Sequence, residues 1–402
     1  MKQFFTIMSL CCLFACTSEQ SQKQIDNKDT TTLAPVVKDS VVLKEELPET
    51  KKSFEVNDSL NALVNIISGI VDENTMFDFV KKCDDFKDFS KSFTKRWLSY
   101  DTTRIARLKK FRETEISKIV AIQPTLFYPF SGPDILHAQT FFPQADKYVM
   151  IGLEPVGSLP VFKKEETDSL ESYFQKINTS LNAILKFSFF RTQSMKEDLK
   201  NEEVNGTLHL LCLFLKRTGN QLASIKPVTV DSLGQIQFVS SFDKLQKLKT
   251  NTRGVEIKFN DIQQQPKVLY YFSLNASDAG LKHNHHFMTY LKQMGAINTY
   301  LKGASYLMHK DYFSMIRQVI LEQSKAVIQD DSGIAFRYFT EGKAKWKYHF
   351  YGDYTKPIPM FAQHYQRDLD SISHLQGSKP LGFGIGYNFR DKNSNFMIAL
   401  KQ

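Results

Sequence analysis

LFYPFSGPDILHAQTFFPQADKYVMIGLEPVG, at residues 126–157, is the stretch that decides the predicted fold. It opens with an apolar run, residues 126–130, that is too short for a helix and rich in aromatic residues, which predicts a buried strand. Turn-forming residues follow at 131–134, and residues 135–142 can form two helical turns before a proline stops them. A second apolar run, residues 148–153, predicts another buried strand. Two buried strands joined through a helix predict a parallel pair.

Three more apolar runs predict further strands of the same sheet. They lie at residues 268–274, within residues 299–308, and at residues 326–329. Residues 334–339 return too soon for a crossover helix, so they predict an antiparallel neighbour of the fifth strand. Glycine alternates with larger residues at 381–389, and together with residues 395–400 this segment predicts a closing β-hairpin.

The fold class predicted from these runs is α/β, with a mixed, largely parallel sheet and flanking helices. Apolar residues recur at helical spacing over residues 56–120, which predicts a helical N-terminal section. The predicted divisions of the chain are a signal peptide at 1–15, a polar and disordered tether at 16–53, the helical section at 54–120, and the α/β body with its C-terminal hairpin at 121–402.

The N-terminus has the pattern of an exported protein. Lys2 precedes an apolar run at residues 4–14 that is too short to span a bilayer. The tetrapeptide LFAC at residues 13–16 resembles the lipobox of bacterial lipoproteins. That resemblance implies that Cys16 is acylated and anchors the body to a membrane, by default the outer membrane because no Asp follows it. A secretory signal cleaved nearby is the alternative, and the pattern leaves open which side of the membrane the body faces.

Composition predicts a large folded body with two cysteines outside the signal region. The chain has 402 residues, of which 42% are hydrophobic and 33 are Phe, so it can bury a large core. Cys83 and Cys212 remain after lipidation of Cys16. In an oxidising envelope they could form a disulfide, or they could stay as two buried thiols.

The formal net charge is +9, and most of the excess lies in residues 81–112. Such a stripe can bind an anionic envelope component, such as lipid, lipopolysaccharide or polysaccharide, or it can be the solvated face of a helix pair. A tethered envelope protein is not expected to bind nucleic acid, and the oligomeric state is not predicted. The basic residues of the stripe are Lys81, Lys82, Lys87, Lys91, Lys95, Arg96, Arg104, Arg107, Lys109, Lys110 and Arg112.

Polar residues that could bind a ligand follow each of the five predicted strands. If the strands are parallel, their exit loops meet at one edge of the sheet, where α/β folds place ligands. Carboxylates gathered there repel each other, so some have raised pKa values and can donate protons, or together they bind a cation or a polar ligand. The alternative is that Asp and Ser cap helices at these loops. The candidate ligand-binding residues are Ser131, Asp134, Glu154, Asp278, His309, Asp330 and Asp331.

Residues 128–134, YPFSGPD, resemble the D-P-F-x-G-x-G loop of amino-methyltransferases. The resemblance implies a strand, a small-residue loop, a helix and an acid-ended second strand, with Glu154 in the place of the carboxylate that holds the ribose of S-adenosylmethionine. The chain departs from that pattern, because Tyr128 replaces the acid, Pro133-Asp134 replaces the second glycine, and the catalytic D-P-P-Y tetrad is missing. We therefore take the local fold from this resemblance and predict no cofactor.

The function predicted from these features is binding, by a membrane-anchored envelope lipoprotein with a polar ligand or partner in a cleft at the strand ends. One alternative is an envelope hydrolase, glycan-directed, that uses two carboxylates from Glu154, Asp330 and Asp331. Another is an interaction scaffold that uses the basic helices. No pattern identifies a catalytic residue or a metal site, and no nucleophile elbow, P-loop or zinc-hydrolase motif is present.

Overall fold

The computed structural model describes residues 52–165, 168–187, 205–249, 252–354, 356–389 and 394–402. The predicted signal peptide, the lipobox and almost all of the predicted tether lie outside the described residues. Residues Thr50–Gln402 form one compact unit, so the helical N-terminal section and the α/β body belong to the same unit.

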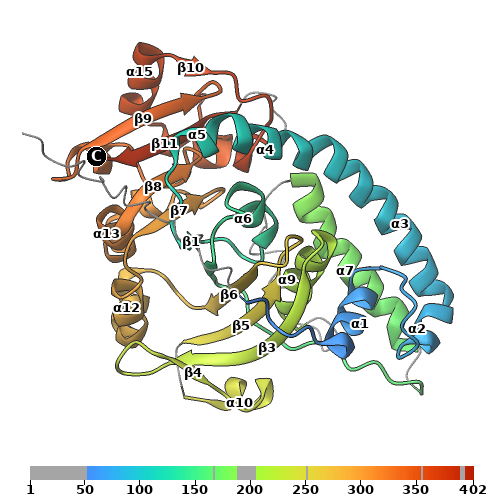
Figure 1. Cartoon of the computed structure of the whole chain (residues 1–402). Coiled ribbons are helices and arrows are strands. Elements are labelled where there is room, and N and C mark those ends of the chain that lie inside the picture. Colours follow the sequence, from blue (N-terminus) through green and yellow to red (C-terminus); the bar gives the residue numbers. More distant parts are fainter. Residues whose placement is uncertain (1–51, 166–167, 188–204, 250–251, 355, 390–393) are drawn as a thin grey trace, which may run out of the picture. The chain divides into compact units, whose positions relative to one another are not determined.

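One mixed sheet runs through the described part of the chain. Its strand order is β10-β9-β11-β8-β7-β1-β2-β6-β5-β3-β4 (Figure 1). The strands are β1 (Thr125–Pro129), β2 (Lys147–Gly152), β3 (Gln221–Val230), β4 (Ile236–Phe238), β5 (Arg253–Asn260), β6 (Pro266–Ser273), β7 (Ile297–Leu301), β8 (Ser324–Gln329), β9 (Trp346–Tyr351), β10 (Ser378–Lys379) and β11 (Phe396–Lys401).

The five central strands, β8-β7-β1-β2-β6, all run parallel. When these five strands are numbered 1 to 5 in chain order, their order across the sheet from β6 to β8 is 3-2-1-4-5. This is the arrangement of the doubly wound Rossmann sheet. These are the five predicted strands, so the α/β class and their common direction are confirmed. The pairs that flank them are antiparallel except the short pair β9–β10, so the sheet is mixed and its long parallel part is the centre.

Helices cover both faces of this sheet. Every residue of β1 is buried, and its side chains alternate between two hydrophobic cores, with Leu126 and Tyr128 in one and Phe127 in the other. A sheet buried on both faces needs a helical layer on each. The first core contains α1 (Asp58–Ile67), α6 (Ile135–Phe141), α7 (Asp168–Phe187) and α9 (Leu208–Arg217), and the second contains α11 (Asp278–His283), α12 (His285–Lys292) and α13 (Ser314–Gln323) (Figure 1).

A long bent helical segment packs on the first face. It follows the short α2 (Asp78–Lys82) and consists of α3 (Asp84–Tyr100), η1 (Asp101–Ile105), α4 (Ala106–Phe111), η2 (Arg112–Ile116) and α5 (Ser117–Ile119). The η1 and η2 segments are π-helical turns, which are rare and recur at functional sites. Each directs an arginine inward: Arg104 donates to the Gly384 carbonyl at 2.6 Å, and Arg112 donates to the Thr140 carbonyl at 3.3 Å.

The basic residues of the N-terminal stripe do not all face solvent. Lys87, Lys91 and Lys95 on α3 are exposed. Arg96 instead hydrogen-bonds to the Asn178 side chain on α7, and the two arginines of the π turns reach inward as described above. The stripe is therefore partly structural, and its exposed part consists mainly of lysines.

The two cysteines in the described part of the chain are free thiols. Cys212 is fully buried on α9 among apolar side chains, where burial raises the pKa of its thiol. Cys83 is half-buried between α2 and α3, and its Sγ lies 3.2 Å from the Phe79 carbonyl. Of the two alternatives left open by the sequence, the structure has the free thiols.

The exit of β7 lies earlier in the chain than predicted. We expected the fourth strand to end near His309, but β7 ends at Leu301. Beyond it the backbone is left-handed at Gly303, Ser305 and Tyr306, with φ values of 57°, 53° and 53°. Left-handed backbone cannot continue a strand. Lys302 therefore opens the exit loop.

Two predicted strands near the C-terminus are wrong. Residues 334–339 enter a short helix, α14 (Arg337–Thr340), because the edge of β8 that they would have paired is occupied by β11. Residues 381–389 form no strand and contain a 3₁₀ turn, η6 (Gly386–Asn388). A C-terminal antiparallel pair does exist, but its partners are β9 and β11.

Candidate ligand-binding site

The exits of β1 and β7 form the topological switch point of the sheet. From β1 the chain crosses to β2 on one side, and from β7 it crosses to β8 on the other, an arrangement that places ligands in many α/β folds. Both exits contain non-glycine residues in the left-handed region: Phe130 with φ 60°, and Ser305 and Tyr306 with φ 53°. Such backbone costs free energy and clusters at functional sites. The backbone strain therefore indicates a functional site at this edge of the sheet.

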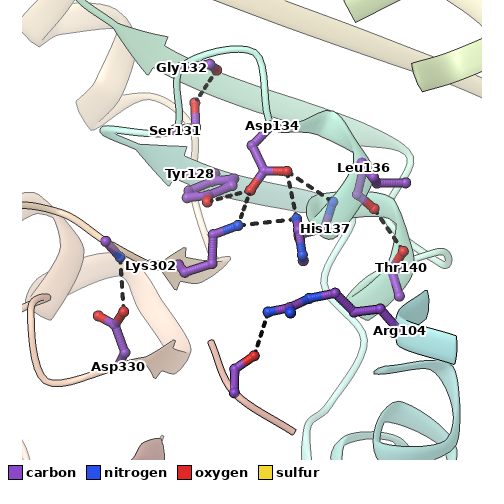
Figure 2. Close-up of polar contacts among 12 residues, drawn as sticks. Arg104, Tyr128, Ser131, Gly132, Asp134, Leu136, His137, Thr140, Lys302 and Asp330 are labelled. Carbon is purple, nitrogen blue, oxygen red and sulfur yellow. Dashed lines mark hydrogen bonds and ion pairs between the residues drawn. The ribbon is translucent and has the colours of Figure 1, made fainter. Parts of the chain in front are cut away.

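Asp134 and Lys302 form a buried ion pair beneath the β1 exit (Figure 2). Asp134 caps α6, and its Oδ1 accepts from the backbone N of His137 at 3.3 Å and lies 2.8 Å from the Nδ1 of the same residue. Its Oδ2 accepts from the Lys302 Nζ at 2.5 Å and from the Tyr128 hydroxyl at 2.9 Å. All four side chains are buried, so water does not screen the pair.

The pKa values of this network follow from burial and from the close charges. Burial would raise the pKa of Asp134, but His137 and Lys302 outweigh it and hold the pKa at about 2. Burial lowers the pKa of His137 to about 4 against the opposing charge of Asp134, so the ring is neutral at pH 7. Burial also lowers the pKa of Lys302, again opposed by Asp134. The charges of Asp134 and Lys302, whose atoms lie 2.5 Å apart, therefore each oppose the effect of burial on the other.

Asp330 approaches the same edge from the end of β8. Its Oδ2 accepts from the Gly303 N at 2.9 Å, and its Oδ1 accepts from the N and Oγ of Ser332 at 3.0 and 2.5 Å. Gly386 packs directly against it, because a Cβ at that glycine would lie 1.8 Å from Oδ2. Burial raises the pKa of Asp330, and these hydrogen bonds and the charge of Lys302 oppose the shift.

Asp331 is buried beside a small cavity. Its Oδ2 accepts from the Tyr306 hydroxyl at 2.6 Å, and its Oδ1 accepts from the Asn395 Nδ2 at 3.3 Å. Burial, followed by the charge of Asp330, raises its pKa to about 7. The cavity is lined by this carboxyl and by residues of β9 and β11, and its volume of about 20 Å³ holds one water molecule. Asp331 can therefore exchange a proton near neutral pH.

An aromatic layer with His309 encloses this carboxyl group. The His309 ring contacts Tyr306 edge-on with the centroids 5.1 Å apart, and it contacts His364 at 5.3 Å. Tyr306 stacks on His364 at 5.0 Å and on Tyr387 at 6.1 Å. Burial lowers the pKa of His309 to about 3, so its ring is neutral at pH 7.

The other predicted residues stand apart from these groups. Ser131 is buried, and its hydroxyl bonds the carbonyls of Gly132 and of a β2 residue. Glu154 follows β2 and is buried, with its Oε2 3.5 Å from the Tyr271 hydroxyl. The Asp278 carboxylate accepts from the Met315 N at 2.8 Å, so it caps α13. The structure therefore joins Asp134 and Asp330 around Lys302, and Asp331 and His309 around Tyr306.

Four residues of the site were missed by the sequence analysis, namely Lys302, His137, Arg104 and Tyr306. A lysine directly after an apolar run was a usable signal for Lys302, but the predicted strand end was placed too late. His137 lies three residues after Asp134 at the start of a predicted helix, a spacing that brings two side chains to one face. Arg104 was predicted only as a member of the basic stripe, because its inward direction depends on a π turn. Tyr306 gave no signal, because its placement depends on left-handed backbone.

A second cavity lies at the opposite edge of the sheet. Its volume is about 60 Å³, and it is lined by residues that include Ile116, Leu126 and Phe141 from η2, β1 and α6. The described residues that line it carry no formal charge. Although it is the larger cavity, it lacks the titratable groups on which a polar site depends.

No family model matches the chain, and neither a curated protein nor a solved structure matches it. The loop at residues 128–134 would place S-adenosylmethionine over the exits of β1 and β2, but the residues present do not fit that cofactor. A Cβ at Gly152 would lie 2.4 Å from the Tyr271 hydroxyl, 2.6 Å from the Glu154 Oε2 and 3.2 Å from the Gly132 Cα. These groups fill the space beside β2, and Glu154 is 2% exposed. We derive no step through that cofactor.

The pH dependence of stability is expected to report the raised pKa of Asp331. Its ordinary pKa is 3.8 and its folded value is about 7, so the folded state binds the proton more tightly. The stabilisation is complete below pH 4 and is lost as the pH rises to 7. We expect the unfolding free energy of wild type minus that of Asp331→Asn to fall by about 2–4 kcal/mol between pH 4 and pH 8 in urea titrations. The same difference at both pH values would contradict the assignment.

Proposed function

We propose that the chain is a membrane-anchored lipoprotein of a bacterial envelope, whose α/β body binds a small polar ligand at the switch point. The convergence of Asp134, Lys302 and Asp330 on one edge of the parallel strands supports this site. Burying charges costs free energy even when they are paired. A buried charged network at the ends of the strands is therefore better explained by ligand binding than by a gain in stability. Backbone strain at the same edge adds to this support.

The chemistry at this edge suits a ligand with both donors and acceptors. Asp331, with a pKa of about 7, offers a carboxylic acid proton or a carboxylate. The Tyr306 hydroxyl and the Asn395 amide adjoin it. The Asp331 oxygens have further lone pairs beyond these two hydrogen bonds, which a polar ligand can use and an apolar ligand cannot.

The proposed lipid anchor is tested at Cys16. In the native bacterial host, Cys16→Ser should abolish incorporation of radioactive palmitate and move the protein from the membrane fraction to the soluble fraction, because acyl chains are the attachment. Cys12→Ser, a matched change in the same apolar segment, should leave both unchanged. Among the described residues, no helix is long and apolar enough to cross a membrane. Palmitate incorporation in Cys16→Ser equal to that of wild type would refute the anchor.

The proposed ligand is tested by native mass spectrometry of the full chain in mild detergent. We expect wild type to carry a mass excess that denaturation removes, and Asp331→Asn to lose at least about 90% of it, because the proton and the charge are both removed. Asp311→Asn is the matched control, since Asp311 is exposed near the same loop. Equal occupancy in wild type and Asp331→Asn, or no mass excess in wild type, would count against the proposed site.

The pKa of Asp331 also favours a second candidate function, an envelope hydrolase in which this carboxyl is the general acid. Glu154 is a poor partner for it, because β7 and β1 lie between β8 and β2. At about 4.8 Å per strand the two exits are about 14 Å apart, beyond the roughly 5–9.5 Å of glycosidase carboxylate pairs. Asp330 is the remaining partner. Release of reducing ends from envelope glycans by wild type, lost in Asp331→Asn, would favour this function.

A further inference from the structure

Four unsatisfied polar atoms lie beneath the switch point, on the side of the sheet covered by α6. They are Nε2 of His137, Nε of Arg104 and the hydroxyls of Tyr100 and Tyr300, and each is buried without a hydrogen-bond partner among the described residues. Three of these side chains are more than nine-tenths buried, with exposures of 0% for His137 and Tyr300 and 7% for Tyr100. Buried polar atoms nearly always have partners, so several together require one that the chain does not supply.

The four atoms come from elements that are far apart in the sequence. His137 belongs to α6, Tyr300 to β7, and Tyr100 and Arg104 to the junction of α3 with the η1 π turn. Figure 2 shows the Nε2 edge of the His137 ring facing the Arg104 guanidinium. Burial raises the pKa of both tyrosines, and the charges of Arg104 and Asp134 act on both as well. The four side chains therefore lie within the range of one another's charges, in one buried part of the molecule.

His137 can present either a donor or an acceptor at its Nε2 atom. Its Nδ1 lies 2.8 Å from the Asp134 Oδ1 and 3.1 Å from the Lys302 Nζ. If Nδ1 carries the proton and donates to the carboxylate, Nε2 is an acceptor. If both nitrogens carry protons, Nδ1 still donates to the carboxylate and Nε2 is a donor as well. The ring then carries a positive charge, which an anion at Nε2 stabilises against the effect of burial.

In the second form every unsatisfied group here can donate. The Arg104 Nε–H, the His137 Nε2–H and the two tyrosine hydroxyls have no acceptor among the described residues. Among the described residues, no carboxylate lies within ion-pair distance of Arg104. Several donors around one guanidinium are the arrangement that binds carboxylates and other oxyanions.

We propose that His137, Arg104, Tyr100 and Tyr300 form an internal site for a small carboxylate or similar oxyanion. The anion accepts from all four side chains and selects the Nε2–H form of His137. In the ligand of the proposed function this group is the anionic end, and to that extent the inference rests on that function. Arg104 is half-buried, and its guanidinium is held by the hydrogen bond to the buried Gly384 carbonyl.

Titration of the full chain, labelled with ¹⁵N-histidine, with sodium formate tests this site. We expect the imidazole nitrogen signals of His137, assigned with His137→Gln, to shift saturably toward the Nε2–H form. The thermal unfolding midpoint should rise over the same concentration range. A parallel titration with sodium phosphate separates a site for oxyanions in general from a site for carboxylates. Sodium chloride at matched ionic strength should produce neither change.

Variants of Arg104 decide whether the response comes from this site. Arg104→Met should abolish the formate response, whereas Arg107→Met removes the same charge from an exposed position and should leave it intact. If Arg104→Met does not fold, Arg104→Lys replaces it. This variant should raise the formate dissociation constant about tenfold, because the planar guanidinium with its fixed N–H donors is lost.

Two results would overturn the inference. One is a wild-type protein in which formate and phosphate act no differently from chloride, as expected if a water molecule alone fills the site. The other is a variant of Arg104 that responds like wild type. If formate binds here while wild type carries no ligand mass, this site stands and the proposed function fails. If ligand mass is lost in Asp331→Asn while formate has no effect, the function stands and this site fails.

Discussion

Replacing Lys302 by methionine is expected to lower the free energy of unfolding by about 3–5 kcal/mol, because the Asp134 carboxylate then stays buried without its cation. The side chains of both residues are 1% exposed, and 2.5 Å separates Nζ from Oδ2. Water therefore cannot replace the ammonium, as it does for an ion pair at the surface. Urea denaturation followed by circular dichroism measures the loss.

A matched exposed pair separates this effect from the general loss of a lysine. The Lys87 Nζ lies 2.7 Å from the Asp84 Oδ1, but these side chains are 57% and 93% exposed, so Lys87→Met should cost less than about 1 kcal/mol. The double variant Lys302→Met/Asp134→Leu should recover most of the stability lost by the single variant, since it removes the uncompensated charge. Equal costs for Lys302→Met and Lys87→Met would show that the buried pair does not exist in solution.

Gly386→Ala is expected to destabilise the protein by more than about 3 kcal/mol. The new Cβ would lie 1.8 Å from the Asp330 Oδ2, and the backbone there has φ 58°, which penalises any residue with a Cβ. Asp330 cannot move aside without losing its hydrogen bonds to Gly303 and Ser332. The loss should appear as a lower urea midpoint and a lower thermal midpoint.

Gly382 provides the control for this substitution. Its φ is 79°, but no described atom lies within 4 Å of the position its Cβ would take, so Gly382→Ala should cost about 1–2 kcal/mol from backbone strain alone. Asp330→Ala in the Gly386→Ala background should make the double variant less destabilised than the sum of the single changes, because the clashing oxygen is gone. If the two glycine variants cost the same, the close approach of Gly386 to Asp330 is refuted.

The centre of the sheet was predictable because its strands are buried on both faces. Such strands are apolar throughout, as β1 and β2 are, and a short uninterrupted apolar run indicates them. The same signal failed at residues 334–339, where the buried residues 334–336 lead into the short helix α14 and not into a strand. The alternation of glycine with larger residues at 381–389 predicted a strand, but Gly386 there packs closely against Asp330 and the backbone forms a 3₁₀ turn.

The acidic half of the site was predictable, and the basic half was not. Asp330 and Asp331 follow β8 directly, and Asp134 follows β1 after the loop at residues 130–133, so parallel strands bring them to one edge. Lys302 was not predicted, because the predicted end of the fourth strand lay beyond the left-handed residues Ser305 and Tyr306. No apolar pattern indicates that conformation. Their conformation depends on contacts made far along the chain, such as the bond between the Ser305 N and the Tyr387 hydroxyl at 3.1 Å.

The π turn at Asp101–Ile105 has a consequence for the alignment of this chain with related sequences. An i→i+5 turn accommodates one residue more than an α-helical turn. The helices before and after it therefore keep their buried faces, although one extra residue lies between them. A relative with a one-residue deletion in this segment would keep the same core and lose the inward direction of Arg104. Gaps at this point of an alignment would therefore separate relatives that keep the inward-directed Arg104 from relatives that have lost it.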